Sequence, residues 1–148
     1  MAKFGKASLA KLATCDVKLQ QIMENVLERI DISVQYGHRT VQEQQKLFSQ
    51  GRSFVNGRWI KTGKTVTDMD GVVKKSMHNY YPSKAIDITP YPLDWKDINA
   101  FIKVKDIVFE EANKLGIKLT WGADWDGDGN IAEHKLQDYP HYELKEIK

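Results

Sequence analysis

Few side chains in this sequence combine the types and the spacing that metal-dependent chemistry requires. The sequence has four histidines, which are His38, His78, His134 and His141. Cys15 is the only cysteine, so a cluster of thiolate ligands is excluded. A catalytic zinc takes three protein ligands and keeps one position open for water. His78, Asp87 and His141 would supply two imidazoles and one carboxylate, although each of them, taken alone, could equally be structural.

Asp138 lies three residues before His141, close enough in sequence to share a site with it. A carboxylate beside an activated water can serve as a general base. Upstream, Ser76-Met77-His78 precedes Ala85-Ile86-Asp87. Together these segments resemble the D-alanyl-D-alanine carboxypeptidase-like zinc peptidases, and most closely the phage L-alanyl-D-glutamate peptidases. That family has a first motif Ser-x-His-x-x-Gly-x-Ala-x-Asp and a second motif with Glu or Asp three residues before the last zinc ligand. The resemblance implies zinc on His78, Asp87 and His141, with Asp138 as the general base.

The resemblance spans nearly the whole chain, with one clear departure between His78 and Asp87. Eight residues separate them, where the family motif has six, and Ser83 stands where the family usually has glycine. The two extra residues, together with Tyr80, Tyr81 and Pro82, predict a bulged loop over the site.

A third element that resembles the family is His38-Arg39-Thr40, which precedes a predicted helix containing Gln44 and Gln45. By resemblance, Arg39 would bind a substrate carbonyl or carboxylate and stabilise the oxyanion. A guanidinium suits this role because its donors form a fixed fork and its charge persists. A surface arginine near a helix start is the alternative. Ser76 would support the site by hydrogen bonding, or is a plain turn serine.

A second candidate metal site follows at residues 124–131, which match the first eight positions of an EF-hand loop. The twelfth position is Lys135 rather than Glu, but Glu133 could close a shortened loop. Some phage relatives have an acidic calcium-binding loop here, so the resemblance supports calcium. We expect calcium to order this loop and to position the catalytic strand, with a solvated Asp-Gly turn as the alternative. The predicted ligands are Asp124, Asp126, Asp128, Asn130 and Glu133.

Length and composition limit the protein classes that remain. The 148 residues fit one catalytic domain, residues 1–148, without a separate cell-wall-binding domain. No apolar run approaches the length of a membrane span, and we identify no signal peptide. Residues 1–64 carry 11 Lys/Arg against 5 Asp/Glu, and the remainder carries 11 against 15. The basic residues 1–64 could bind an anionic polymer, or they could form a solvated face. No other feature of the sequence supports nucleic-acid binding.

The periodicity of apolar residues predicts the elements that position these side chains. Helical spacing predicts helices over residues 8–13, 16–30, 40–50 and about 94–115. Alternation and β-branched residues predict strands over residues 32–36, 85–89, 118–121 and 142–144. Asn56-Gly57 predicts a small hairpin within residues 54–61. The expected fold is α+β, a small mostly antiparallel β-sheet with helices packed on one face.

The resemblance implies a zinc endolysin that hydrolyses the L-Ala–D-Glu bond of bacterial peptidoglycan stem peptides during phage-induced lysis. A D-Ala-D-Ala carboxypeptidase is the nearest alternative, because the same residues would serve it. A second alternative is a catalytically silent cell-wall-binding module that depends on zinc or calcium. The presence of Asp138, a candidate general base, makes this alternative less favourable. The expected partners are peptidoglycan and a separate holin-type pore protein. We expect a monomer without stable membrane insertion, located in the host cytoplasm before lysis.

Overall fold

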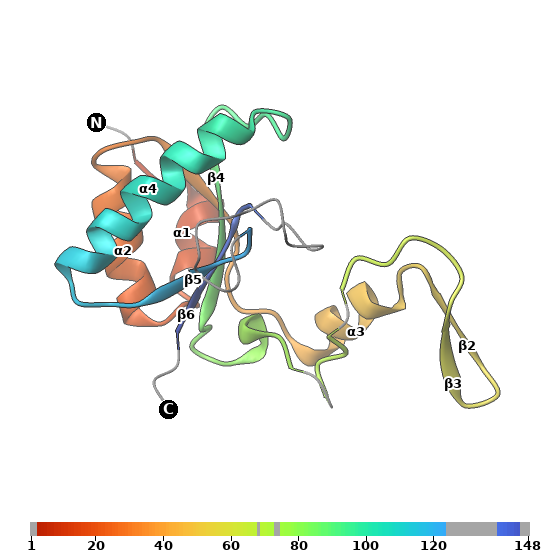
Figure 1. Cartoon of the computed structure of the whole chain (residues 1–148). Helices are drawn as coiled ribbons and strands as arrows, with labels where there is room; N and C mark the ends of the chain where they lie inside the picture. The colour runs from red at the N-terminus through yellow and green to blue at the C-terminus, as the bar shows by residue number, and fades with distance from the viewer. Residues whose placement is uncertain (1–2, 68, 73–74, 124–138, 146–148) are drawn as a thin grey trace.

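The computed structural model describes residues 3–67, 69–72, 75–123 and 139–145. Asp138 and the predicted calcium ligands at positions 124–133 therefore lie outside the described residues. In chain order the elements are α1 (Lys6–Leu12), α2 (Val17–Leu27), β1 (Ile32–Tyr36), α3 (Val41–Ser49), β2 (Arg52–Val55), β3 (Arg58–Lys61), the short 3-10 helix η1 (Met77–Asn79), β4 (Ala85–Pro90), α4 (Ile98–Lys114), β5 (Leu119–Trp121) and β6 (His141–Leu144). Figure 1 shows their arrangement.

Four strands form the main sheet, in the order β1-β4-β6-β5, and every neighbouring pair is antiparallel. All six residues of β4 are buried, and this strand has a neighbouring strand on each side. The strands β2 and β3 form a separate antiparallel hairpin. The predicted α+β fold with a mostly antiparallel sheet is therefore confirmed.

The helices α2 and α4 pack on one face of the main sheet (Figure 1). The helix α2 begins after Asp16, whose side chain accepts a hydrogen bond from the backbone N–H of Lys18. Its apolar residues recur at helical spacing, so one stripe faces the core. Buried members of this stripe are Leu19, Ile22, Met23, Val26 and Leu27. They pack with residues of β1, β4 and α4 in a single hydrophobic core.

The helix α4 begins at Ile98, four residues after the predicted start. Asp94 instead closes a turn in which its side chain accepts from the backbone N–H of Lys96. Asp97 is the N-cap, because its carboxylate accepts from the backbone N–H of Ala100.

Among the described residues, no helix has the length and apolarity needed to span a bilayer.

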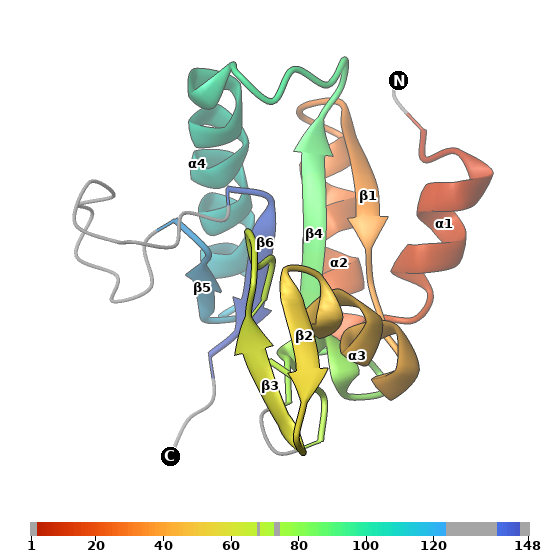
Figure 2. The same ribbon diagram turned by 90° about the vertical axis from the view of Figure 1, so that its right-hand side faces the viewer.

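The helix α3 and the β2–β3 hairpin lie on the other side of the sheet from α2 and α4 (Figures 1 and 2). Thr40 and Glu43 form a capping box that starts α3, in which each side chain accepts a hydrogen bond from the other residue's backbone N–H. The predicted hairpin is confirmed, with Asn56 and Gly57 at φ of 50° and 76°, as a two-residue turn of the primed type requires.

Candidate active site

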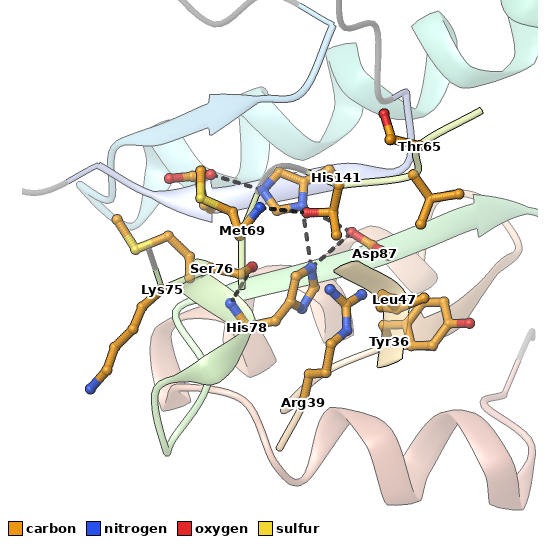
Figure 3. Close-up of a pocket in the computed structure, with 14 residues that line it drawn as sticks. Tyr36, Arg39, Leu47, Thr65, Met69, Lys75, Ser76, His78, Asp87 and His141 are labelled. Atoms are coloured by element: carbon orange, nitrogen blue, oxygen red, sulfur yellow. Dashed lines mark hydrogen bonds and ion pairs between the residues drawn. The ribbon is translucent and has the colours of Figure 1, made fainter. Parts of the chain in front are cut away.

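His78, Asp87 and His141 converge from three different elements. His78 comes from η1, Asp87 from the central strand β4, and His141 is the first residue of β6. Asp87 and His141 are register partners across the β4–β6 ladder, which fixes their spacing. The Oδ1 atom of Asp87 lies 3.2 Å from Nε2 of His78 and 3.1 Å from Nδ1 of His141. The two imidazole nitrogens are 3.3 Å apart (Figure 3).

The three side chains fit a tetrahedral metal ion. Their ligand atoms all lie within 4.8 Å of one another, and all three residues are buried. Nitrogen and oxygen ligands of a tetrahedral zinc, at roughly 2.0–2.1 Å from the ion, lie about 3.3 Å from one another. The separations of 3.1–3.3 Å match this spacing, so an ion would fit without rearrangement of the three residues. Two imidazoles and one carboxylate are a donor set typical of catalytic zinc.

Each imidazole is oriented by a hydrogen bond at its other nitrogen. Nδ1 of His78 lies 2.7 Å from the carbonyl oxygen of Gly37, so Nδ1 carries the proton and Nε2 is left to bind a metal. Nε2 of His141 lies 2.8 Å from Oε1 of Glu143, so its Nδ1 faces the cluster. Such partners fix the tautomer and the ring orientation of metal-binding histidines. The sequence reasoning missed Glu143, although alternation along a strand places it on the same side as His141.

Asp87 is ionised within the cluster. Burial alone would raise the pKa of its carboxyl group, but contact with the imidazoles of His141 and His78 outweighs this effect. The pKa of Asp87 consequently lies well below its ordinary value. A buried carboxylate that stays charged is suited to bind a cation.

The backbone around η1 is held by several hydrogen bonds. The side chain of Ser76 accepts from the backbone N–H of His78 at 3.2 Å, and the backbone N–H of Ser76 donates to the side chain of Asn79. The backbone N–H of Arg39 donates to the carbonyl oxygen of His78 at 2.8 Å. These contacts set the position of His78 relative to the segment that carries Arg39.

The loop that contains the two extra residues turns away from the site. Ser83 is fully buried, donates its backbone N–H to the carbonyl oxygen of Thr14 and accepts from the backbone N–H of Asp16. These hydrogen bonds join the loop to the connection between α1 and α2. Tyr81 packs edge-on against His38 and is 72 % exposed, and neither Tyr80 nor Tyr81 is among the described residues lining the cavity. The expected loop over the site is therefore wrong, because Ser83 ties the loop to the α1–α2 connection and neither tyrosine lines the cavity.

A cavity of about 540 Å³ opens over the three ligand candidates (Figure 3). Figure 3 shows the guanidinium of Arg39 pointing toward Asp87 and the two imidazoles. Nη1 of Arg39 donates to Oε1 of Gln44 at 2.8 Å, and the Gln44 amide donates to the carbonyl oxygen of Met69 at 2.8 Å. Gln44 is fully buried, so it links Arg39 to the segment that forms the opposite wall of the cavity.

The structure brings together five predicted site residues, which are Arg39, Ser76, His78, Asp87 and His141. Asp138 remains a sequence prediction, because the described chain resumes at Tyr139. His141 is nevertheless held at the start of β6, since the carbonyl oxygen of the preceding Pro140 accepts from the backbone N–H of Ile88. The calcium-loop prediction and His134 also fall outside the described residues.

Comparisons with known proteins agree with this geometry. A family model described as phage L-alanyl-D-glutamate peptidase matches residues 1–145. An L-alanyl-D-glutamate peptidase of Escherichia phage T5 is 37 % identical over 134 residues, covering 86 % of this chain and 85 % of that protein. The solved L-Ala D-Glu endopeptidase ChiX of Serratia marcescens shares the fold, with a TM-score of 0.68, 19 % identity, and coverage of 97 % of this chain and 90 % of that chain. This chain therefore belongs to the phage L-alanyl-D-glutamate peptidase family.

Proposed function

We propose that this protein is a zinc-dependent endolysin that hydrolyses the L-Ala–D-Glu bond in the stem peptides of bacterial peptidoglycan. The buried cluster of His78, Asp87 and His141 beneath an open cavity is the observation that carries this proposal. Membership of the family supports the choice of bond. We extend the proposal to a single catalytic domain over residues 1–148 that acts as a monomer. A separate holin-type pore protein would give it access to the wall from the host cytoplasm.

Zinc is the ion that best suits the donor set, because two neutral imidazoles and one carboxylate leave a fourth tetrahedral position open. When bound, it would supply Lewis-acid activation of water and of the scissile carbonyl. His78, Asp87 and His141 would hold it, with Gly37 and Glu143 fixing the two rings. The low pKa of Asp87 keeps its carboxylate available at neutral pH.

The proton transfers are assigned to Asp138, three residues before His141. In this proposal Asp138 takes the proton of the attacking water and passes it to the leaving amine. Arg39 stabilises the negative charge that develops on the carbonyl oxygen, since its guanidinium points toward the cluster and is held by Gln44. Ser76 acts indirectly, by capping the turn that carries His78.

Calcium is proposed as a second ion, bound by the acidic loop of residues 124–133. Its support is the alternation of acidic and amide side chains at Asp124, Asp126, Asp128 and Asn130, followed by Glu133. Because Asp138 and His141 follow this loop, calcium would order the segment that carries the general base. Chelation of calcium with zinc retained should therefore lower activity, and calcium should restore it. Activity that is indifferent to calcium would reject this role.

The decisive experiment is mass spectrometry of Gram-negative peptidoglycan digested by the protein with and without zinc. Zinc-dependent release of stems that begin with D-Glu, absent for Asp138→Ala, is the expected result. Loss of only a terminal D-Ala would instead identify a carboxypeptidase. Intact wall with zinc still bound would identify a silent binding module.

A further inference from the structure

The β2–β3 hairpin exposes apolar side chains on both of its faces. Phe54 and Trp59 are register partners and share one face, with ring centroids 5.2 Å apart. Val55 and Ile60 lie on the opposite face, because side chains alternate along a strand. These four residues are 62 %, 47 %, 44 % and 46 % exposed, in the order Phe54, Trp59, Val55 and Ile60. A two-stranded ribbon with exposed apolar side chains on both faces is marginal in water, so the hairpin suits a partner.

The chain around the hairpin is strongly basic. Residues 44–67 contain five Lys/Arg and no Asp/Glu. Arg52 is used inside the fold, since Nη1 donates to the carbonyl oxygens of Phe48 and Thr67. Arg58, Lys61 and Lys64 are exposed. This concentration of positive charge beside exposed apolar side chains selects an anionic partner.

The hairpin is held in a fixed position relative to the body of the protein. Phe48 in α3 contacts Trp59 edge-on at a centroid distance of 5.6 Å, and the guanidinium of Arg52 stacks over Phe48 at 3.9 Å. At the base, the carbonyl oxygen of Gly51 accepts from the backbone N–H groups of Thr62 and Gly63. The hairpin thus extends from α3 away from the main sheet as a preformed arm (Figure 1).

We propose that this arm binds reversibly to the anionic phospholipid surface of a bilayer. A flat protein partner or a glycan strand would cover one face of the ribbon, whereas the interfacial layer of a bilayer surrounds both. Sugars can stack on Phe54 and Trp59, but they offer no apolar phase to Val55 and Ile60. Tryptophan favours the membrane interface, and Lys and Arg beside it reach the anionic headgroups. The proposal does not rest on the peptidase assignment, because it invokes none of the site residues.

The test is flotation of the full-length, zinc-loaded protein with lipid vesicles. One set contains phosphatidylcholine alone, and the other contains phosphatidylglycerol as about one third of the lipid. We expect at least roughly tenfold stronger association with the anionic vesicles, and a decrease as salt is added. Equal association with both sets, or with neither, would overturn the proposal.

Substitutions in the hairpin distinguish three explanations of vesicle binding, which are insertion of both hairpin faces into the interface, docking of one face, and an effect of net charge alone. Phe54→Thr and Ile60→Thr each remove an apolar side chain from a different face and keep a residue with high strand propensity. Insertion predicts that both single variants weaken vesicle binding several-fold, and an effect of only one would contradict it. Arg58→Glu with Lys61→Glu should abolish the preference for anionic vesicles. Lys18→Glu with Lys103→Glu, exposed on α2 and α4, makes the same change in net charge and should leave most of the binding intact.

Two control measurements test whether the variants are folded and whether their active site is intact. Thermal unfolding should show that every variant is folded, and hydrolysis of a small soluble stem-peptide fragment should be unchanged, because the hairpin contributes none of the three ligand candidates. Purified peptidoglycan sacculi provide the competing partner. Binding to sacculi that is lost in Phe54→Thr, with no binding to vesicles, would assign the arm to the wall and overturn the membrane proposal.

Discussion

His141 and Glu143 form a hydrogen-bonded pair on one side of β6, with 2.8 Å between Nε2 and Oε1. Because Glu143 occupies Nε2, the Nδ1 atom of His141 faces Asp87 at 3.1 Å. We predict that Glu143→Ala weakens zinc binding by about 10–100-fold, since loss of such a partner frees the ring and its tautomer. Competition with a chromophoric chelator measures the affinity. Glu143→Gln keeps an acceptor oxygen and should be affected less; an unchanged affinity in Glu143→Ala would remove this role.

Metal removal should affect both activity and stability. A ligand that binds only the folded state raises its stability by mass action, and the cluster exists only when β4 and β6 are paired. Dialysis against a chelator should therefore abolish hydrolysis and lower the melting temperature by several degrees. Zinc should restore both, whereas calcium alone should not restore hydrolysis. A melting temperature that is the same with and without zinc would mean that the ion does not bind at this cluster.

Arg39 should contribute to the transition state rather than to folding. We predict that Arg39→Ala lowers kcat/KM by about 10²–10³-fold, as loss of an oxyanion donor does in other enzymes. Arg39→Lys should recover only part of this loss, because lysine lacks the planar fork that meets Gln44. Steady-state kinetics on a stem-peptide substrate would show the effect mainly in kcat. Near-normal kinetics in Arg39→Ala would place the oxyanion donor elsewhere.

Tyr142 carries a buried hydroxyl. Its OH group has no hydrogen-bond partner among the described residues, and burial raises the pKa of Tyr142 well above its ordinary value. Removing an unsatisfied buried hydroxyl restores about 1–3 kcal/mol of desolvation cost, less any loss of packing. Tyr142→Phe should therefore leave the free energy of unfolding unchanged or raise it by about 1 kcal/mol. Chemical denaturation tests this, and clear destabilisation would indicate a partner for the hydroxyl.

Glu111 in α4 forms ion pairs with Lys114 and with Arg29, which follows the end of α2. Hydrogen bonds from Lys114 and Arg29 hold the pKa of Glu111 below its ordinary value of 4.5. A carboxyl group with a lowered pKa in the folded state contributes stability above the unfolded pKa and loses it as the pH falls through the folded value. Glu111→Gln should thus lower the melting temperature at pH 7, and the difference from the native protein should shrink below about pH 4.5. A difference that is independent of pH would mean that charge is not its source.

The sequence was sufficient to predict elements whose signals are local. The spacing of Leu19, Ile22 and Val26 predicted α2, and Asn56-Gly57 predicted the turn between β2 and β3. The start of α4 was misplaced because Asp94 and Asp97 are both good caps, and only the folded loop decides between them. Local patterns thus located the elements but not every boundary.

The candidate site was predicted as a set of residues, but not as an arrangement. The sequence motif predicted His78, Asp87 and His141 as ligands. It did not predict the carbonyl oxygen of Gly37 that orients His78, because a backbone carbonyl has no sequence signature. The link from Arg39 through Gln44 to Met69 depends on how a long segment folds back over α3. The path of the insertion was likewise decided by a tertiary contact, the burial of Ser83 beside the α1–α2 connection.

The strand order has a consequence for when the enzyme becomes active. β6 lies between β4 and β5 in the sheet, although it follows both in the chain. During synthesis, β5 therefore has no strand to pair with in the main sheet, and His78 and Asp87 lack their third companion, until the ribosome has released the segment from His141 to Leu144. A nascent or truncated chain that stops earlier would carry most of the sequence yet no complete metal site. Pairing of β6 with β4 and β5 is thus the step that brings His141 to His78 and Asp87 and assembles the metal site.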